Sequence, residues 1–162
     1  MVESIIINKS AGIEEQYQLL FKQVKSLLDK NDSIISNLSN CTAALKQTFN
    51  KISWVGFYLY DGTELYLGPF QGKVACTKIQ IGKGVCGTSA MNRETIIVPD
   101  VYKFPGHIAC DVESRSEIVV PIIKNDKLYG VLDLDSASLS AFNQTDKKYL
   151  EEIVDFLAKE IL

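Results

Sequence analysis

Apolar residues recur every three or four positions in the first third of the chain, which is the spacing of one helical face. This pattern predicts an amphipathic helix over residues 13–28 and a second helix over residues 32–49, with Asp32 or Ser33 as the cap of the second. Cys41 falls on the apolar stripe of the second helix. We therefore expect Cys41 to pack in a core as a small apolar residue.

The pattern changes to strand-like segments after residue 52. Aromatic and β-branched residues dominate SWVGFYLYDG, and its Asp61-Gly62 pair predicts a hairpin turn into ELYLGPF. Further strands are predicted for KVACTKIQ, ETIIVPD, SEIVVPIIK and KLYGVLDLDS, with Asn125-Asp126 as a tight turn between the last two. About six strands result, several of them antiparallel neighbours.

The C-terminal segment TDKKYLEEIVDFLAKEIL again has helical spacing, with Thr145 as its expected cap. Its apolar face comprises Tyr149, Ile153, Phe156 and Leu157. Two helices, a mostly antiparallel sheet and a final helix make an α+β domain, in which helices cover one sheet face and loops on the other shape a pocket.

Composition narrows the function classes. The 162 residues are 46% hydrophobic and 23% charged, without an internal linker or repeat, so we expect one soluble domain over residues 1–162. The net charge of -3 comes without a basic block, which argues against nucleic acid as a partner. The chain shows no signal peptide and no run of roughly 18 apolar residues, so we expect a cytoplasmic protein with no membrane contact.

Four cysteines in a reducing cytosol need an explanation other than structural disulfides. Core packing explains Cys41. A Cys₃His metal site built from the remaining three cysteines, Cys76, Cys86 and Cys110, with His107 is poorly supported, because the chain has no C-x-x-C pair. Thiol redox chemistry is the better interpretation of these three cysteines, since a nucleophilic thiol and a second thiol are its minimum machinery.

Three glycines in IGKGVCGTSA, namely Gly82, Gly84 and Gly87, match the G-x-G-x-x-G pattern before the short helical stretch TSAMNR. A dinucleotide site would need a surrounding βαβ unit, and the neighbouring hairpins argue against one. The glycines then make a turn or let the backbone approach a ligand. Amides at the start of a helix favour an anion such as a carboxylate.

Acidic residues converge on one face of the predicted sheet. Asp133 and Asp135 lie two apart on a strand, so both carboxylates point to one side, and Glu117 can reach the same side from the preceding antiparallel strand. A solvated face is the plain explanation. The alternative is a site for an ammonium group, or a pair of carboxyls whose repulsion keeps one proton bound near neutral pH.

Aromatic residues form a second candidate feature. Trp54 and Tyr58 alternate through Gly56 onto one strand face. Core packing is the plain explanation of this wall. The alternative is a pocket for a soft, methyl-bearing group, because sulfur and methyl groups pack well on aromatic rings.

The surroundings of Cys110 set a condition on its chemistry. The nearby acids Asp111, Glu113 and Glu117 disfavour a thiolate. The acids are explained if the substrate carries a cation that they bind. They are also explained if the leaving oxygen of the substrate must be protonated, because a protonated carboxyl then assists the attack of the thiol. A sulfoxide that carries an amine has both properties.

The motifs WVGFYL, LGPFQGKVAC, GKGVCGTSA, GHIACD, SEIVVP and GVLDLDS, in this order, closely resemble those of the free methionine-R-sulfoxide reductases, which are single GAF domains. The resemblance covers most of the chain and includes three of the four cysteines. It implies a six-stranded antiparallel sheet with helices on one face and a pocket on the other, and it is compatible with a homodimer.

The resemblance also implies roles for particular residues. Cys110 would attack the sulfoxide, Cys76 would resolve the sulfenic acid as a disulfide, and Cys86 would be an auxiliary thiol. Glu117, Asp133 and Asp135 match the acids that hold the substrate amine and assist protonation, while Trp54 and Tyr58 match the pocket for the methyl group. The implied substrate is free methionine-R-sulfoxide, the implied reductant is thioredoxin, and no bound cofactor is needed.

Two other classes stay open from the sequence. A non-catalytic GAF sensor would bind a small ligand and signal through a separate protein. A thiol switch would form its disulfide without any sulfoxide present.

Overall fold

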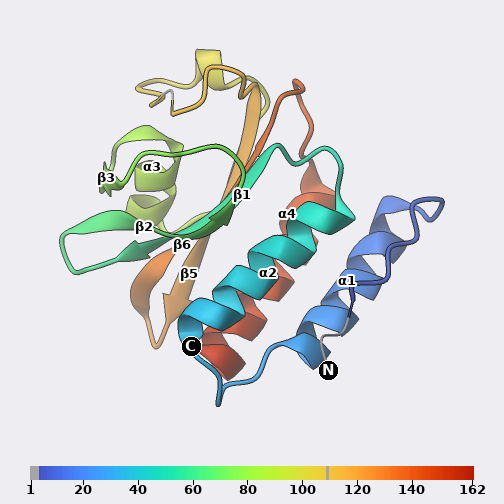
Figure 1. Ribbon diagram of the computed structural model, residues 1–162. Coiled ribbons are helices and arrows are strands. Elements are labelled where there is room, and N and C mark those ends of the chain that lie inside the picture. The colour runs from blue at the N-terminus through green and yellow to red at the C-terminus, as the bar shows by residue number, and fades with distance from the viewer. Residues whose placement is uncertain (1–3, 109) are drawn as a thin grey trace.

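A computed structural model describes residues 4–108 and 110–162. The helices are α1 (Ile13–Leu27), α2 (Ile34–Thr48), α3 (Gly84–Asn92) and α4 (Gln144–Phe156), with a 3-10 turn at Val101–Lys103 and a π-helical end at Leu157–Ile161. The strands are β1 (Trp54–Tyr60), β2 (Glu64–Gln71), β3 (Lys78–Gln80), β4 (Ile96–Val98), β5 (Ser116–Lys124) and β6 (Lys127–Ser136). They form one antiparallel sheet of order β3-β2-β1-β6-β5-β4, with α1, α2 and α4 on one face and α3 on the other (Figure 1).

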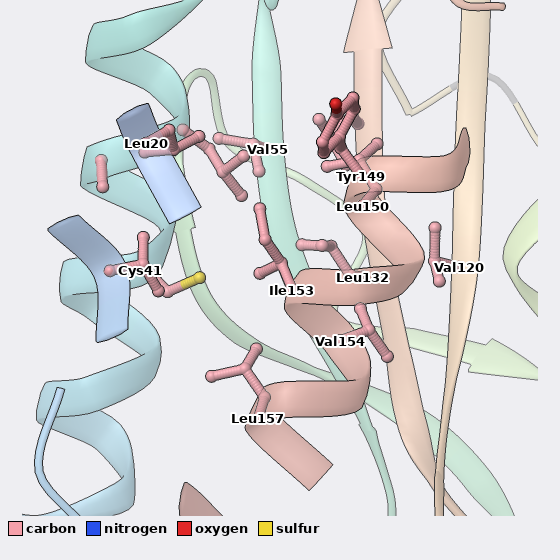
Figure 2. Packing of buried hydrophobic residues seen from close by; sticks show 14 of the residues in the cluster. Leu20, Cys41, Val55, Val120, Leu132, Tyr149, Leu150, Ile153, Val154 and Leu157 are labelled. Carbon is pink, nitrogen blue, oxygen red and sulfur yellow. The ribbon is translucent and has the colours of Figure 1, made fainter. Parts of the chain in front are cut away.

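The helix-covered face holds the larger core because the strands alternate apolar residues onto it. Leu132 and Leu134 of β6 and Val55 of β1 are fully buried there, against α4 and α2. Figure 2 shows Leu132 beside Ile153 of α4, in the space between the helices and the sheet. Cys41 of α2 is 0% exposed in this core, so the prediction that it packs as a small apolar residue is confirmed.

Both predicted hairpins are present. Asp61 closes the β1–β2 turn by accepting from the backbone N–H groups of Thr63 and Glu64. β5 and β6 match the predicted segments SEIVVPIIK and KLYGVLDLDS residue for residue.

The prediction of one strand over KVACTKIQ is largely wrong, because only Lys78–Gln80 is a strand. In the preceding segment only the Thr77 carbonyl accepts from β2, through the N–H of Leu67, and two other carbonyls accept from side chains of β1. Trp54 Nε1 donates to the Lys73 carbonyl and the Tyr58 hydroxyl donates to the Cys76 carbonyl, each at 3.0 Å. The segment therefore lies over the sheet as a loop.

Helix ends differ from the predictions by at most four residues, when the π-helical end is counted with α4. Asn143, and not Thr145, caps α4: its side chain accepts from the N–H groups of Thr145 and Asp146, and the Asp146 carboxylate accepts from the N–H of Asn143. This reciprocal pair satisfies donors that a helix start leaves free. Ser33 precedes α2, and its side chain makes no capping bond.

α3 also begins earlier than the predicted TSAMNR stretch. It starts at Gly84, so two of the three glycines of the loop motif, Gly84 and Gly87, lie inside the helix.

Candidate active site

A pocket lies on the face of the sheet opposite the larger core. Its floor is formed by β1, β5 and β6, one wall by the start of α3, and its mouth by the loops that precede β3 and β5. The pocket admits water-sized molecules over about 50 Å³. Every site residue predicted from the sequence lines it except Cys76: Trp54, Tyr58, Cys86, Cys110, Glu117, Asp133 and Asp135.

Three carboxyls meet at the bottom of this pocket. Glu117 of β5 pairs in register with Asp135 of β6, and Asp133 lies two residues earlier on the same face of β6. Glu117 and Asp133 are each 6% exposed. The structure therefore brings together the three acids that strand periodicity placed on one face.

Burial and mutual repulsion favour the protonated forms of these acids. Burial raises the pKa of Glu117 well above its usual value, and the neighbouring charges of Asp133 and Asp135 raise it further. The pKa of Asp133 is raised well above its usual range by burial and then by Asp135. Burial raises the pKa of Asp135 to about 6, against the lowering effect of a hydrogen bond from Ser114. The site can thus hold protons at neutral pH while it attracts a cation.

Ser114 is a site residue that sequence reasoning missed. Its hydroxyl donates to Asp135 Oδ1 at 2.6 Å, and the side chain is buried in the pocket lining. Ser114 lies two residues before β5 in an irregular loop, where no periodicity indicates the direction of a side chain.

An aromatic wall lies on β1, beside the strand that carries the two aspartates. The rings of Trp54 and Tyr58 lie 6.0 Å apart, and Phe70 of β2 stacks on Trp54 at 5.5 Å. Gly56 makes this packing possible, because a Cβ there would overlap the Trp54 ring and lie 2.6 Å from the Cβ of Phe70. The wall offers an apolar, polarisable surface suited to a methyl or sulfur group.

A disulfide joins Cys76 to Cys110 at the mouth of the pocket. Their Cα atoms lie 5.7 Å apart although 34 positions separate them in the chain, so the bond connects the loop before β3 with the loop before β5. The resemblance to the family implied this pair. Because two of the three thiols of the alternative Cys₃His site are consumed, that site does not exist in this state.

Cys86 is a buried free thiol on the wall of the pocket that α3 forms. Its Sγ lies 4.0 Å from Glu117 Oε1. Burial raises the pKa of Cys86 well above its usual value, and Asp133 and Glu117 add to the effect. The group is therefore a neutral thiol at physiological pH.

A lysine offsets two of the acids beside Cys110. Lys73 pairs with Glu113 and also lies 3.5 Å from Asp111. The acid cluster that argued against a thiolate at Cys110 is thus partly neutralised by a residue from the loop that carries Cys76, a contact that the sequence did not indicate.

The glycine motif forms the N-terminal end of α3. Gly82 and Gly84 have positive φ angles of 80° and 61°, and a Cβ on Gly87 would overlap the Gln80 carbonyl oxygen. The adjoining residues Lys83, Gly84 and Val85 line the pocket, where the first N–H groups of the helix have no intrahelical acceptor. This end of the pocket suits an anion.

None of the helices within residues 4–108 and 110–162 is long and apolar enough to cross a bilayer.

Comparisons with known proteins agree on one family. The sequence profile of the GAF domain matches residues 33–161. GAF domain-containing protein A of Dictyostelium discoideum is 52% identical over 158 residues, covering 97% of this chain and 99% of that protein. Free methionine-R-sulfoxide reductase of Saccharomyces cerevisiae is 46% identical, covering 94% of this chain and 91% of that protein. The X-ray structure of free methionine-R-sulfoxide reductase from Neisseria meningitidis in complex with its substrate superposes with a TM-score of 0.90 at 42% identity, over 96% of this chain and 95% of that one.

Proposed function

The chain belongs to the GAF domain family and, within it, to the free methionine-R-sulfoxide reductases, and from this membership we propose that it reduces free L-methionine-R-sulfoxide to methionine through its own cysteines. The observation that carries the cysteine mechanism is the Cys76–Cys110 disulfide at the mouth of a pocket floored by three buried carboxyls. A sensor that only binds a ligand could use the carboxyls but would not need the disulfide.

Each part of the substrate has a complementary surface in the pocket. The ammonium group binds the carboxyl cluster of Glu117, Asp133 and Asp135, one oxygen of which has no hydrogen-bond partner within the described part of the chain. The carboxylate binds the N–H groups at the start of α3. The methyl group packs on Trp54 and Tyr58. A methionine within a peptide has neither free charge, so this site favours the free amino acid.

The reaction begins when the Cys110 sulfur attacks the sulfoxide sulfur and a carboxyl of the cluster donates a proton to the sulfoxide oxygen. The oxygen passes to Cys110 as a sulfenic acid and methionine leaves. The Cys76 thiol then attacks the sulfenic sulfur, water leaves, and the disulfide forms. Two electrons from a dithiol return both cysteines to thiols, and thioredoxin is the proposed donor, so no bound cofactor is needed.

Cys86 takes an auxiliary part in this scheme. It is a neutral, buried thiol beside Glu117, and it becomes a partner for oxidised Cys110 only if the loops at the mouth rearrange. We also propose that the protein acts in the cytoplasm, that residues 1–162 form one domain, and that a homodimer is its assembled form.

The test measures methionine released from the R and S epimers of free L-methionine sulfoxide, with dithiothreitol as reductant. We expect release from the R epimer alone and none from Cys110→Ser. Cys76→Ser should complete one turnover and then stall, with thioredoxin as well as with dithiothreitol at low concentration. Retained turnover in Cys110→Ser would refute the nucleophile, and an unchanged multiple-turnover rate in Cys76→Ser would refute the resolving role.

A further inference from the structure

Three potential metal ligands from three different elements meet at the floor of the pocket. Cys86 comes from α3, Glu117 from β5 and Asp133 from β6, and one ligand atom of each lies within 4.8 Å of the other two. All three side chains are buried. They are fixed by regular secondary structure and not by the loops at the mouth.

The protein does not neutralise this cluster from its own cations. Within residues 4–108 and 110–162, Glu117 and Asp133 form no ion pair with any lysine, arginine or histidine. The Oδ1 atom of Asp133 is buried and has no hydrogen-bond donor among the described residues. A buried carboxyl oxygen without a donor is costly, and it indicates that a ligand completes the site.

The ligand set selects the class of ion. One thiolate and two carboxylates suit a borderline metal such as zinc, whereas magnesium and calcium require six or more oxygen ligands. Sulfur and oxygen ligands of tetrahedral zinc lie about 3.5 Å apart, so the cluster needs to contract by about 1 Å to hold such an ion. The ion would replace the thiol proton of Cys86 and any protons held by Glu117 and Asp133, which are released to solvent, because metal ligands bind in their deprotonated forms.

The fourth coordination position opens into the pocket. The free space of about 50 Å³ exceeds the roughly 10–15 Å³ that one water requires. A water or a substrate group can therefore complete a tetrahedral site.

We propose that Cys86, Glu117 and Asp133 form a binding site for zinc or a similar thiophilic divalent cation, in which the ion occupies the place of the substrate ammonium. The binding site itself does not depend on the catalytic activity. The competition with substrate rests on the proposed function.

Cadmium is the probe, because a cadmium–thiolate bond adds an ultraviolet charge-transfer absorption. The experiment uses the protein with the Cys76–Cys110 disulfide closed, so that the remaining thiols are Cys41 and Cys86. Cys41 is the matched control, since it is also buried but lies in the larger core, on the helix-covered face of the sheet. We expect one equivalent of cadmium to produce the absorption in the wild type and in Cys41→Ala, and zinc to remove it by competition.

Two variants test the ligands. Cys86→Ala should lose the absorption. Asp133→Asn should weaken cadmium binding at least about tenfold, because the loss of an outer-shell partner alone typically costs that much affinity. Circular dichroism establishes that each variant is folded, and Cys41→Ser replaces Cys41→Ala if the alanine variant is not. No absorption in the wild type, or absorption retained in Cys86→Ala, would overturn the site.

A separate titration tests the competition. Free L-methionine-R-sulfoxide should raise the apparent dissociation constant of cadmium, while the S epimer, which chelates cadmium in solution equally well, should not. Equal effects of the two epimers would refute the overlap with the amine site and leave the metal site standing. Methionine release without cadmium binding would retain the proposed function and refute the metal site.

Discussion

The two faces of the sheet use neighbouring residues of the same strand for opposite purposes. On β6, Leu132 and Leu134 are 0% exposed in the apolar core under α2 and α4, whereas Asp133 and Asp135 between and beside them face the pocket. The leucines gain free energy from burial, and the buried carboxyls cost free energy. Alternating residues of one strand thus divide into apolar side chains that stabilise the fold and carboxyls that suit the pocket to chemistry.

The largest expected effect falls on the pocket face. Asp133→Asn removes a carboxyl that we propose to hold the substrate amine, so kcat/KM should fall by about 10²-fold or more. The midpoint of thermal unfolding should stay the same or rise, because a costly buried carboxyl is replaced by an amide of the same shape. Activity assays and thermal unfolding check both parts, and a marked loss of stability would break the division between the faces.

The reverse pattern is expected one residue further along the strand. Leu134→Ala leaves a cavity in the helix-side core and should lower the free energy of unfolding by about 2 to 5 kcal/mol. Specific activity per folded molecule should remain unchanged at a temperature where the variant is folded. Urea unfolding and active-site titration measure the two quantities; a selective loss of kcat would show that the core face also shapes the pocket.

The dependence of stability on pH sharpens the comparison. Asp135 has a pKa raised from 3.8 to about 6, so its ionisation destabilises the folded state as pH rises through that interval. Asp135→Asn does not ionise, and its stability relative to the wild type should increase between pH 4 and pH 6 by on the order of 2 kcal/mol. Urea midpoints across this range provide the test. A difference that does not change with pH would mean that Asp135 titrates normally in the fold.

The smallest effect concerns the serine that adjusts this carboxyl. Ser114→Ala removes a donor to the Asp135 carboxylate, so the pKa of Asp135 should rise and the corresponding limb of the pH–activity profile should move by about one unit to higher pH. Ser116→Ala is the control, because Ser116 is a buried serine at the start of β5 whose hydroxyl donates to the Ser138 carbonyl and not to Asp135. A similar movement in both variants would exclude a specific role for Ser114.

Periodicity predicted the regular parts of the fold, since the side chains of β5 and β6 alternate between two environments. The same alternation placed Asp133 and Asp135 together, and the Asn125-Asp126 turn brought Glu117 opposite them. Periodicity could not predict that residues 73–76 leave the sheet. That segment is held by hydrogen bonds from Trp54 and Tyr58, which are distant in sequence.

The parts of the site that depend on loops were not predictable from local patterns. The pairing of Cys76 with Cys110 followed only from resemblance to a family, because spacing does not specify which thiols meet across 34 positions. Ser114 and Lys73 lie in irregular segments, where neither helical nor strand periodicity indicates the direction of a side chain. Such contacts depend on the packing of the whole chain.

The outer strands of the sheet, β3 and β4, have three residues each. A long outer strand presents a row of unpaired backbone groups on which other chains can add as further strands, and short outer strands limit this growth. β3 and β4 therefore offer little backbone for such growth, and each covers only three positions of the longer strand beside it, β2 or β5. Association through side-chain surfaces lets the sequence select the partner, whereas any extended chain could match an open backbone edge.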